Sequence, residues 1–241
     1  MSRSDDRTTA RPPDMVGRPR LRHLLASYRG GLATLLFLCV SAMTLLSGPA
    51  RAADRLRLVA LGDSLTAGYG LPAQAAFPAV LERALTAKGL AVSIENAGVS
   101  GDTTTGGLDR LDWSVPDGTE GVILELGAND MLRGTDPAVA EKNLDAIITR
   151  LTARGIPVLL AGMKAARNLG PDYVARFDAI YPRLAERHGL LLYPFFLDGV
   201  AGDRGLALPD GLHPTAAGVE RIVAGILPTV ETFVARLRKA P

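Results

Sequence analysis

Residues 58–66 read Leu-Val-Ala-Leu-Gly-Asp-Ser-Leu-Thr, an apolar run that ends abruptly in Gly62-Asp63-Ser64. An apolar run without polar alternation predicts a short strand that is buried on both faces. The turn then places Ser64 at the carboxyl end of that strand, where open α/β sheets bind ligands. A helix that begins just after Gly62 would surround the hydroxyl with unpaired backbone N–H groups, which suit a nucleophile whose reaction creates an oxyanion. The alternative interpretation is a plain Ser/Asp helix cap.

Residues 1–52 have the features of a secretory signal peptide. Residues 31–48 carry no charge, arginines precede them, and Ala50-Arg51-Ala52 follows as a small-x-small cleavage site. We therefore expect cleavage after residue 52 and a single mature domain, residues 53–241, in the periplasm or outside the cell. The alternative is an uncleaved membrane anchor, because the apolar run approaches the length of a membrane span.

The basic balance of the whole chain comes from this leader. Residues 1–52 hold eight of the 27 Lys/Arg and three of the 25 Asp/Glu, which leaves 19 basic and 22 acidic residues in the mature part. The mature part therefore gives no argument for a nucleic-acid partner. Cys39 is the only cysteine and lies in the leader, so no disulfide is expected. No Cys, His and carboxylate side chains show metal-ligand spacing, and neither a metal nor a cofactor is expected.

From residue 55 onward, strand-like and helix-like patterns alternate along the chain. Apolar runs predict strands at 56–61, 90–95, 121–126, 156–162 and 190–193. Apolar residues at helical spacing mark the intervening stretches, and Pro182 lies inside one of them, where it should kink the helix. Alternating units of this size predict the α/β class, a three-layer αβα sandwich around a central parallel sheet of about five strands.

Four polar turns, each containing glycine, follow four of the predicted strands. They are Gly62-Asp63-Ser64, the stretch Asn96–Thr103, Gly127-Ala128-Asn129-Asp130 and Asp210-Gly211-Leu212-His213. The carboxyl ends of parallel strands meet at one edge of a sheet, so these turns can converge there. Each turn alone has a bland interpretation, as a simple loop or a surface histidine. Their occurrence together, in this order, favours an active site.

The residue types at these turns suggest nucleophilic catalysis. Ser64 is a weak nucleophile without a base, and His213 is one of only two histidines in residues 53–241. Asp210, three residues before His213, can reach the other ring nitrogen and fix its tautomer. We predict Ser64, Asp210 and His213 as the catalytic residues. Backbone N–H groups of Ser64 and Gly101 and the side-chain amide of Asn129 are the predicted oxyanion hole.

Three further patterns do not support other functions. Gly98-Val99-Ser100-Gly101 is not a Gly-x-Ser-x-Gly elbow, because Asp102 occupies the last position. The stretch Gly68–Ala73 matches the dinucleotide-binding pattern by letters, but it begins seven residues after the strand and contains Pro72. His188 has the ordinary interpretation of a residue at a helix C-terminus.

At these blocks the sequence resembles the GDSL or SGNH hydrolases, and it looks most like their thioesterase I, lysophospholipase and arylesterase branch. The matching residues are Gly62-Asp63-Ser64-Leu65, Gly101 within Ser-Gly-Asp-Thr, Asn129 within Gly-x-Asn-Asp, and Asp210-x-x-His213. The resemblance implies a flavodoxin-like fold with a shallow, exposed site. It also implies hydrolysis of an ester or thioester through an acyl-serine intermediate, with an apolar acyl groove near the loops that follow Asn129 and Gly162.

Two departures from the family pattern lie near this implied groove. Ala128 stands where many members have a second glycine, and the segment Lys164-Ala165-Ala166-Arg167 replaces a neutral, proline-containing one. The expected partner is a small-molecule acyl ester or thioester, and a monomer with at most transient lipid contact is expected. Two alternatives stay open: a carbohydrate O-acetylesterase with the same site, and a non-catalytic envelope binding module on the same fold.

Overall fold

The computed structural model describes residues 55–239, so the predicted signal peptide lies outside the described residues. Five parallel strands form one sheet in the order β2-β1-β3-β4-β5. Their bounds are β1 Leu56–Gly62, β2 Val92–Gly98, β3 Gly121–Glu125, β4 Val158–Ala161 and β5 Leu191–Tyr193. The predicted α/β fold with a five-stranded parallel sheet is confirmed. β4 is shorter than predicted and begins only after Pro157.

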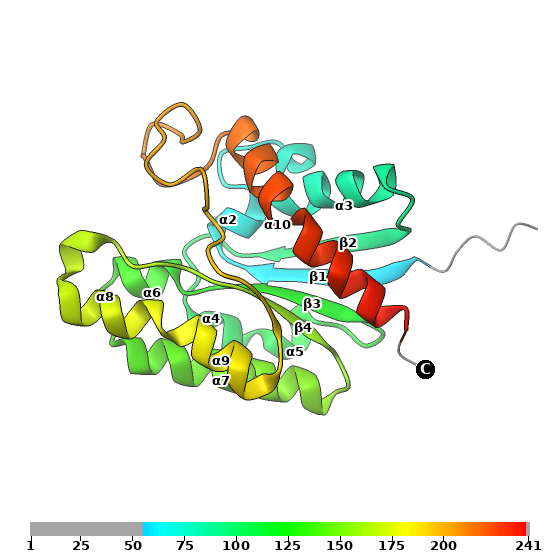
Figure 1. The fold of residues 1–241 in the computed structure, drawn as a ribbon, viewed down its shortest axis with the longest axis horizontal. Coiled ribbons are helices and arrows are strands. Elements are labelled where there is room, and N and C mark those ends of the chain that lie inside the picture. Colours follow the sequence, from blue (N-terminus) through cyan, green and yellow to red (C-terminus); the bar gives the residue numbers. More distant parts are fainter. Residues whose placement is uncertain (1–54, 240–241) are drawn as a thin grey trace, which may run out of the picture. The chain divides into compact units, whose positions relative to one another are not determined.

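Helices cover both faces of the sheet (Figure 1). On one face lie α3, Phe77–Ala87, and the long C-terminal helix α10, Ala216–Leu237, which pack against each other. The other face carries α4 Thr104–Asp109, α5 Leu111–Ser114, α7 Pro137–Ala153 and α9 Ile180–His188. Within residues 55–239, no helix is both long enough and apolar enough to cross a membrane.

The central strands are buried on both faces, which explains their continuous apolar sequence. Every residue of β3 and β4 is buried, and β1 is buried from Leu58 to Gly62. A parallel sheet covered by helices on both sides requires this pattern instead of an alternating one. On α7, the apolar residues at helical spacing are likewise buried: Ala140, Leu144, Ile147, Ile148 and Leu151.

The helix predicted around Pro182 is broken into two. Helix α8 spans Pro171–Asp178, and α9 begins at Ile180. Proline lacks a backbone N–H and is tolerated only in the first turn of a helix, and Pro182 falls in the first turn of α9. The predicted kink is therefore confirmed as a break at Ala179, three residues before the proline.

The strand order reverses between β1 and β3, which are neighbours in the sheet although β2 lies between them in the chain. Open α/β sheets bind ligands in the crevice at such a switch point. Two short helices begin there, α2 Ser64–Ala67 after β1 and α6 Ala128–Leu132 after β3. The same end of the sheet carries the 3-10 turns Ala73–Ala75 and Arg167–Leu169.

Candidate active site

The turn after β1 combines a helix cap with a largely buried serine that lines a cavity. The Asp63 carboxylate caps α2 by accepting a hydrogen bond from the backbone N–H of Leu65 at 2.9 Å. Ser64 is the first residue of that helix. A Cβ at Gly62 would lie 2.6 Å from the carbonyl oxygen of Glu125, so the turn can pack this closely against β3 only with glycine. The cap interpretation is thus correct for Asp63 and leaves Ser64 at the helix N-terminus.

A hydrogen-bonded chain joins the three predicted catalytic residues. The Ser64 Oγ lies 2.9 Å from Nε2 of His213, and Nδ1 of His213 lies 2.6 Å from Oδ2 of Asp210. The other oxygen of Asp210 accepts the backbone N–H groups of His213 and Leu212, at 3.0 and 2.9 Å. These bonds lower the pKa of Asp210 to about 2. An ionised Asp210 keeps a proton on Nδ1 and leaves the lone pair of Nε2 facing the serine hydroxyl.

An aromatic side chain that the sequence analysis missed lies against the histidine. The ring centroids of Tyr69 and His213 are 4.4 Å apart, with a tilt of 36° between the ring planes. Tyr69 follows α2 directly and is half exposed. An aromatic ring stabilises a cation beside it, so Tyr69 is placed to stabilise the charge that His213 gains when it takes the serine proton. In the sequence, Tyr69 stands inside the rejected dinucleotide pattern, and nothing there indicates a contact with residue 213.

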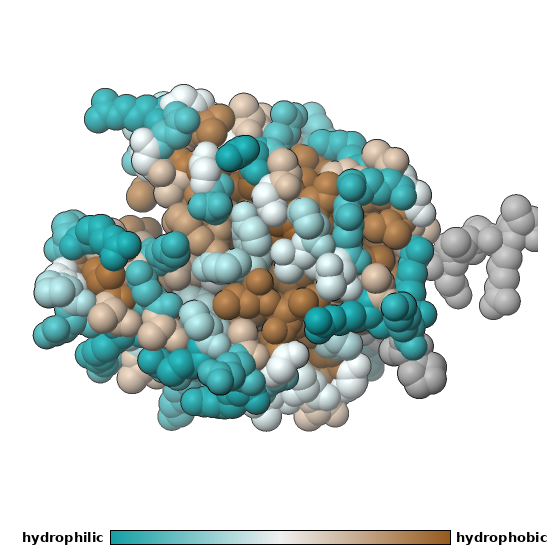
Figure 2. Space-filling model, in the orientation of Figure 1, coloured by the Kyte–Doolittle hydropathy of each residue, from teal (hydrophilic) through white to brown (hydrophobic). Residues whose placement is uncertain are grey.

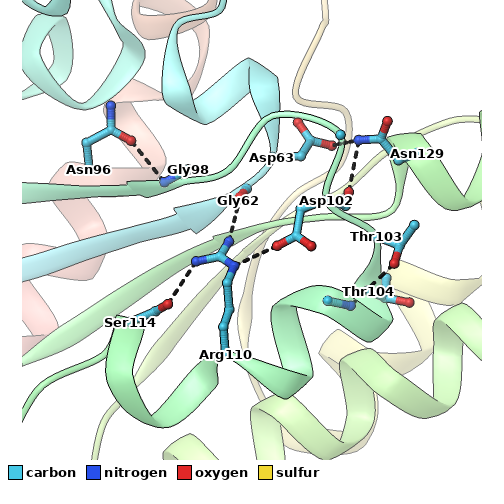
Figure 3. A network of polar contacts seen from close by, with 12 residues as sticks. Gly62, Asp63, Asn96, Gly98, Asp102, Thr103, Thr104, Arg110, Ser114 and Asn129 are labelled. Atoms are coloured by element: carbon cyan, nitrogen blue, oxygen red, sulfur yellow. Dashed lines mark hydrogen bonds and ion pairs between the residues drawn. The ribbon is translucent and has the colours of Figure 1, made fainter.

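The other two predicted oxyanion donors lie in the loop after β2, which holds Gly101, and in the first turn of α6, which holds Asn129. Gly101 has a φ of +81°, which favours glycine, and its carbonyl accepts a 2.7 Å hydrogen bond from Arg133. The side-chain nitrogen of Asn129 donates to Oδ2 of Asp63 at 3.1 Å and to the carbonyl oxygen of Asp102 at 2.9 Å (Figure 3). Both hydrogens of the Asn129 amide therefore have protein acceptors, and an oxyanion must share or replace the Asp102 carbonyl.

A buried arginine ties these loops together (Figure 3). Arg110 is only 7% exposed. Its Nε lies 2.6 Å from the carboxylate of Asp102, Nη1 donates to Ser114 at 2.9 Å, and Nη2 donates to the carbonyl of Gly62 at 2.8 Å. One guanidinium thus joins the end of β1 to the loop that carries Gly101. The sequence analysis missed Arg110 because arginines are usually exposed and no local pattern marks a buried one.

Two carboxyl groups are buried under the serine turn. Asp63 has no exposed surface, and burial raises its pKa to about 6 against the opposing hydrogen bonds from Leu65 and Asn129. Glu125, the last residue of β3, accepts a 2.8 Å bond from the Thr66 hydroxyl, while its Oε1 has no partner among the described residues. Burial and the neighbouring Asp63 raise the pKa of Glu125 well above its usual range. Asp63 accepts two N–H groups and Glu125 accepts one hydroxyl, so ionisation is easier at Asp63 than at Glu125.

A cavity of about 800 Å³ opens beside Ser64, Asn129 and His213. This volume suits a ligand the size of a typical small organic molecule. Figure 2 shows the surface hollowed on this side, between the loop that precedes α10 and the region of α8. The walls are largely apolar and include Met131, Leu132, Met163, Phe195, Leu197, Val200 and Leu212. In the part of the chain from 55 to 239, no group of three His, Cys, Asp or Glu side chains is placed to hold a metal ion.

Comparison with known proteins places the chain in a family. The model of the GDSL-like lipase/acylhydrolase family matches residues 60–221, which include every predicted site residue. The chain belongs to this family. Among curated GDSL relatives, Esterase TesA of Pseudomonas aeruginosa is 37% identical over 178 residues, covering 73% of this chain and 89% of that one. An arylesterase of Vibrio mimicus is 39% identical over 184 residues, covering 76% and 88%.

Solved structures of GDSL and SGNH hydrolases have the same fold. The crystal structure of AlinE4, described as an SGNH-hydrolase family esterase, is 48% identical, with a TM-score of 0.64 over 75% of this chain and 97% of that one. The crystal structure of TesA is 37% identical, with a TM-score of 0.70.

The remaining histidine of the described residues, His188, ends α9 and contacts Asp145 of α7 at 2.7 Å, as expected for a structural residue.

Proposed function

We propose that the protein is a serine esterase or thioesterase whose nucleophile is Ser64. The single observation that carries the proposal is the hydrogen-bonded chain from Asp210 through His213 to Ser64 at the switch point of the sheet. Membership of the GDSL-like lipase/acylhydrolase family supports ester hydrolysis, and relatives of this chain are named esterase, arylesterase and thioesterase 1/protease 1/lysophospholipase L1.

In the proposed reaction, the oxygen of Ser64 attacks the ester or thioester carbonyl while Nε2 of His213 takes the serine proton. The tetrahedral intermediate collapses, and His213 gives this proton to the departing alkoxide or thiolate. The products of this half are the free alcohol or thiol and an acyl-serine. Water then attacks the acyl carbon with His213 again as the base, which releases a carboxylic acid and restores Ser64.

The negative oxygen of each intermediate is proposed to sit among the N–H groups of Ser64 and Gly101 and the amide of Asn129. In the structure both amide hydrogens of Asn129 are already donated, one to Asp63 and one to the carbonyl of Asp102. We infer that Asn129 keeps its bond to the charged Asp63 and turns the other hydrogen from Asp102 to the oxyanion. Asp63 then orients the amide of Asn129, and Arg110 holds the loop that carries the N–H group of Gly101.

The substrate class follows from the cavity. It is larger than an acetyl group needs and is lined mainly by apolar side chains, which favours medium or longer acyl chains over O-acetyl groups. Exposed Leu132 and Leu212 stand among the lining residues, and they support a transient contact with lipid. We propose that the protein acts as a monomer on small-molecule acyl esters and thioesters.

The place of action is proposed from the leader alone. The charge-free run 31–48 and the small-x-small site that follows it support export, cleavage after residue 52, and a mature domain of residues 53–241 in the periplasm or outside the cell. A retained leader would anchor the same domain to a membrane. N-terminal sequencing of the exported protein decides between the two, because an uncleaved chain begins at or before residue 30.

The function is tested by the rate of hydrolysis across a chain-length series of p-nitrophenyl esters and acyl-CoA thioesters. The proposal predicts turnover that rises beyond acetyl and is lost in Ser64→Ala. The matched control is Ser93→Ala, on β2, which should retain full activity. Turnover of acetylated xylan without turnover of octanoyl esters would favour the O-acetylesterase. A folded wild-type protein that hydrolyses none of these substrates would support the binding module instead.

A further inference from the structure

The charged side chains on the wall of the substrate cavity all have one sign. Among the described residues that line it, Lys164 and Arg167 carry full charges, and no aspartate or glutamate lines it. Both belong to the segment Lys164–Arg167, which follows β4. A cavity that is otherwise apolar but carries two cations has an electrostatic preference for a ligand with a negative group.

Neither cation is neutralised by a neighbour among the residues that the structure describes. Within residues 55–239, Lys164 and Arg167 take part in none of the ion pairs. The ammonium of Lys164 lies 5.2 Å from the ring centroid of Phe195, another wall residue, and this contact holds it against the cavity. Asp178, the acid that contacts this segment, accepts the backbone N–H of Ala165 at 2.7 Å and so fixes the segment's path.

The order of the strands indicates which half of the substrate meets these cations. His213 must protonate the leaving group, and it lies against Tyr69, which follows α2 beside β2. Lys164 and Arg167 follow β4, on the opposite side of Ser64, with β3 and its Asn129 in between. With the carbonyl carbon at Ser64, the leaving group extends toward His213 and the acyl chain extends toward the β4 segment.

We propose that Lys164 and Arg167 form an anion subsite that selects esters whose acyl chain carries a carboxylate remote from the scissile bond. The substrates would be monoesters or monothioesters of dicarboxylic acids, hydrolysed to the free dicarboxylic acid. This inference rests on the proposed function, since the acyl half must reach Ser64. The apolar wall between Ser64 and the cations accommodates the methylene chain, and the two cations bind its far end.

The test compares p-nitrophenyl monoesters of dicarboxylic acids, from four to ten carbons, with the same compounds capped as neutral methyl esters. Both substrates release p-nitrophenolate. The kcat/KM of the charged ester divided by that of the neutral ester therefore isolates the effect of the remote charge. The ratio should exceed one at the length that spans the cavity and fall with added salt. In the double variant Lys164→Gln/Arg167→Gln it should fall about tenfold, because two exposed charge pairs each contribute up to roughly fivefold. Lys142→Gln, on the exposed side of α7, is the control and should leave the ratio unchanged.

Two outcomes would overturn the subsite. The first is a ratio that the double variant leaves unchanged at every length, while the neutral esters are still hydrolysed in a Ser64-dependent way. The second is a double variant that loses turnover of acyl-CoA but not of the dicarboxylic monoesters, which would put the bound anion on the leaving group. Absence of any ester hydrolysis in the wild-type protein would instead refute the proposed function itself.

Discussion

Replacing Asp63 by asparagine should separate the stability of the fold from its activity. Asp63 is fully buried, and its carboxylate is bonded by Leu65 and Asn129. Its pKa is about 6, against an ordinary value of 3.8, because burial disfavours the charge. Asp63→Asn keeps the shape and the helix cap but removes the charge. It also places an amide group opposite the amide of Asn129, where an acceptor is required.

The size of the effect follows from the pKa difference. Because the folded pKa lies above the unfolded one, the folded state binds more protons between pH 3.8 and 6. The stabilisation is therefore complete below about pH 3.8 and is lost as the pH rises through 6. A difference of about 2.2 pKa units corresponds to about 3 kcal/mol at 1.36 kcal/mol per unit. Relative to Asp63→Asn, the wild-type free energy of unfolding should fall by most of this amount, about 2–3 kcal/mol, between pH 4 and pH 7.

The assay is urea unfolding of both proteins at pH 4, 5, 6 and 7, with Asp109→Asn, at an exposed position, as a control that should show no trend. At neutral pH the Asp63→Asn protein should also lose most of its kcat, since Asn129 loses the acceptor that orients it. If the difference in unfolding free energy between wild type and Asp63→Asn stays constant from pH 4 to pH 7, the pKa of the buried Asp63 carboxyl is not raised and the reasoning is refuted.

Three further substitutions test single contacts. Asn129→Ala should lower kcat by about 10²-fold to 10³-fold with little change in KM, and Asn129→Asp should be at least as damaging. A near-normal kcat in a folded Asn129→Asp protein would show that Asn129 does not belong to the site. Tyr69→Leu should lower kcat about twofold to fivefold, because the ring stabilises the imidazolium of His213 by roughly 0.5–1 kcal/mol. An equal loss of kcat in Tyr69→Phe, which keeps the ring, would contradict a role for the ring face. Arg110→Leu should cost about 3–5 kcal/mol in urea unfolding, because it leaves the Asp102 carboxylate, only 11% exposed, without its partner. A loss below about 1 kcal/mol would show that the guanidinium does not hold the loops.

The parts predicted from sequence are those that local spacing encodes. Continuous apolar runs predict the buried strands, and polar turns after them predict the edge where Ser64 and Asn129 lie. The separation of Asp210 and His213 by three residues suffices for one turn to bring the carboxylate to Nδ1. These relations depend only on the chain near each residue and on the rule that parallel strands end together.

The parts that were missed depend on contacts between distant segments. Arg110 reaches Gly62, 48 residues earlier, and Tyr69 meets His213 across most of the domain. Glu125 ends an apolar strand, and its burial follows from the neighbours that β1 and β4 supply on either side. An arginine, a tyrosine or a glutamate in such positions is an ordinary surface residue by local pattern. Only the packed structure shows that Arg110 and Glu125 contact the serine turn and that Tyr69 contacts His213.

The measurement that tests the central claim most directly is the covalent labelling of Ser64. The protein is treated with a p-nitrophenyl phosphonate ester, and the adduct is located by mass spectrometry of its peptides. The account predicts one adduct per chain, on Ser64, no adduct in Ser64→Ala, and much slower labelling in His213→Ala, because the imidazole must take the serine proton. An adduct on another residue, together with ester hydrolysis that survives in Ser64→Ala, would contradict the account.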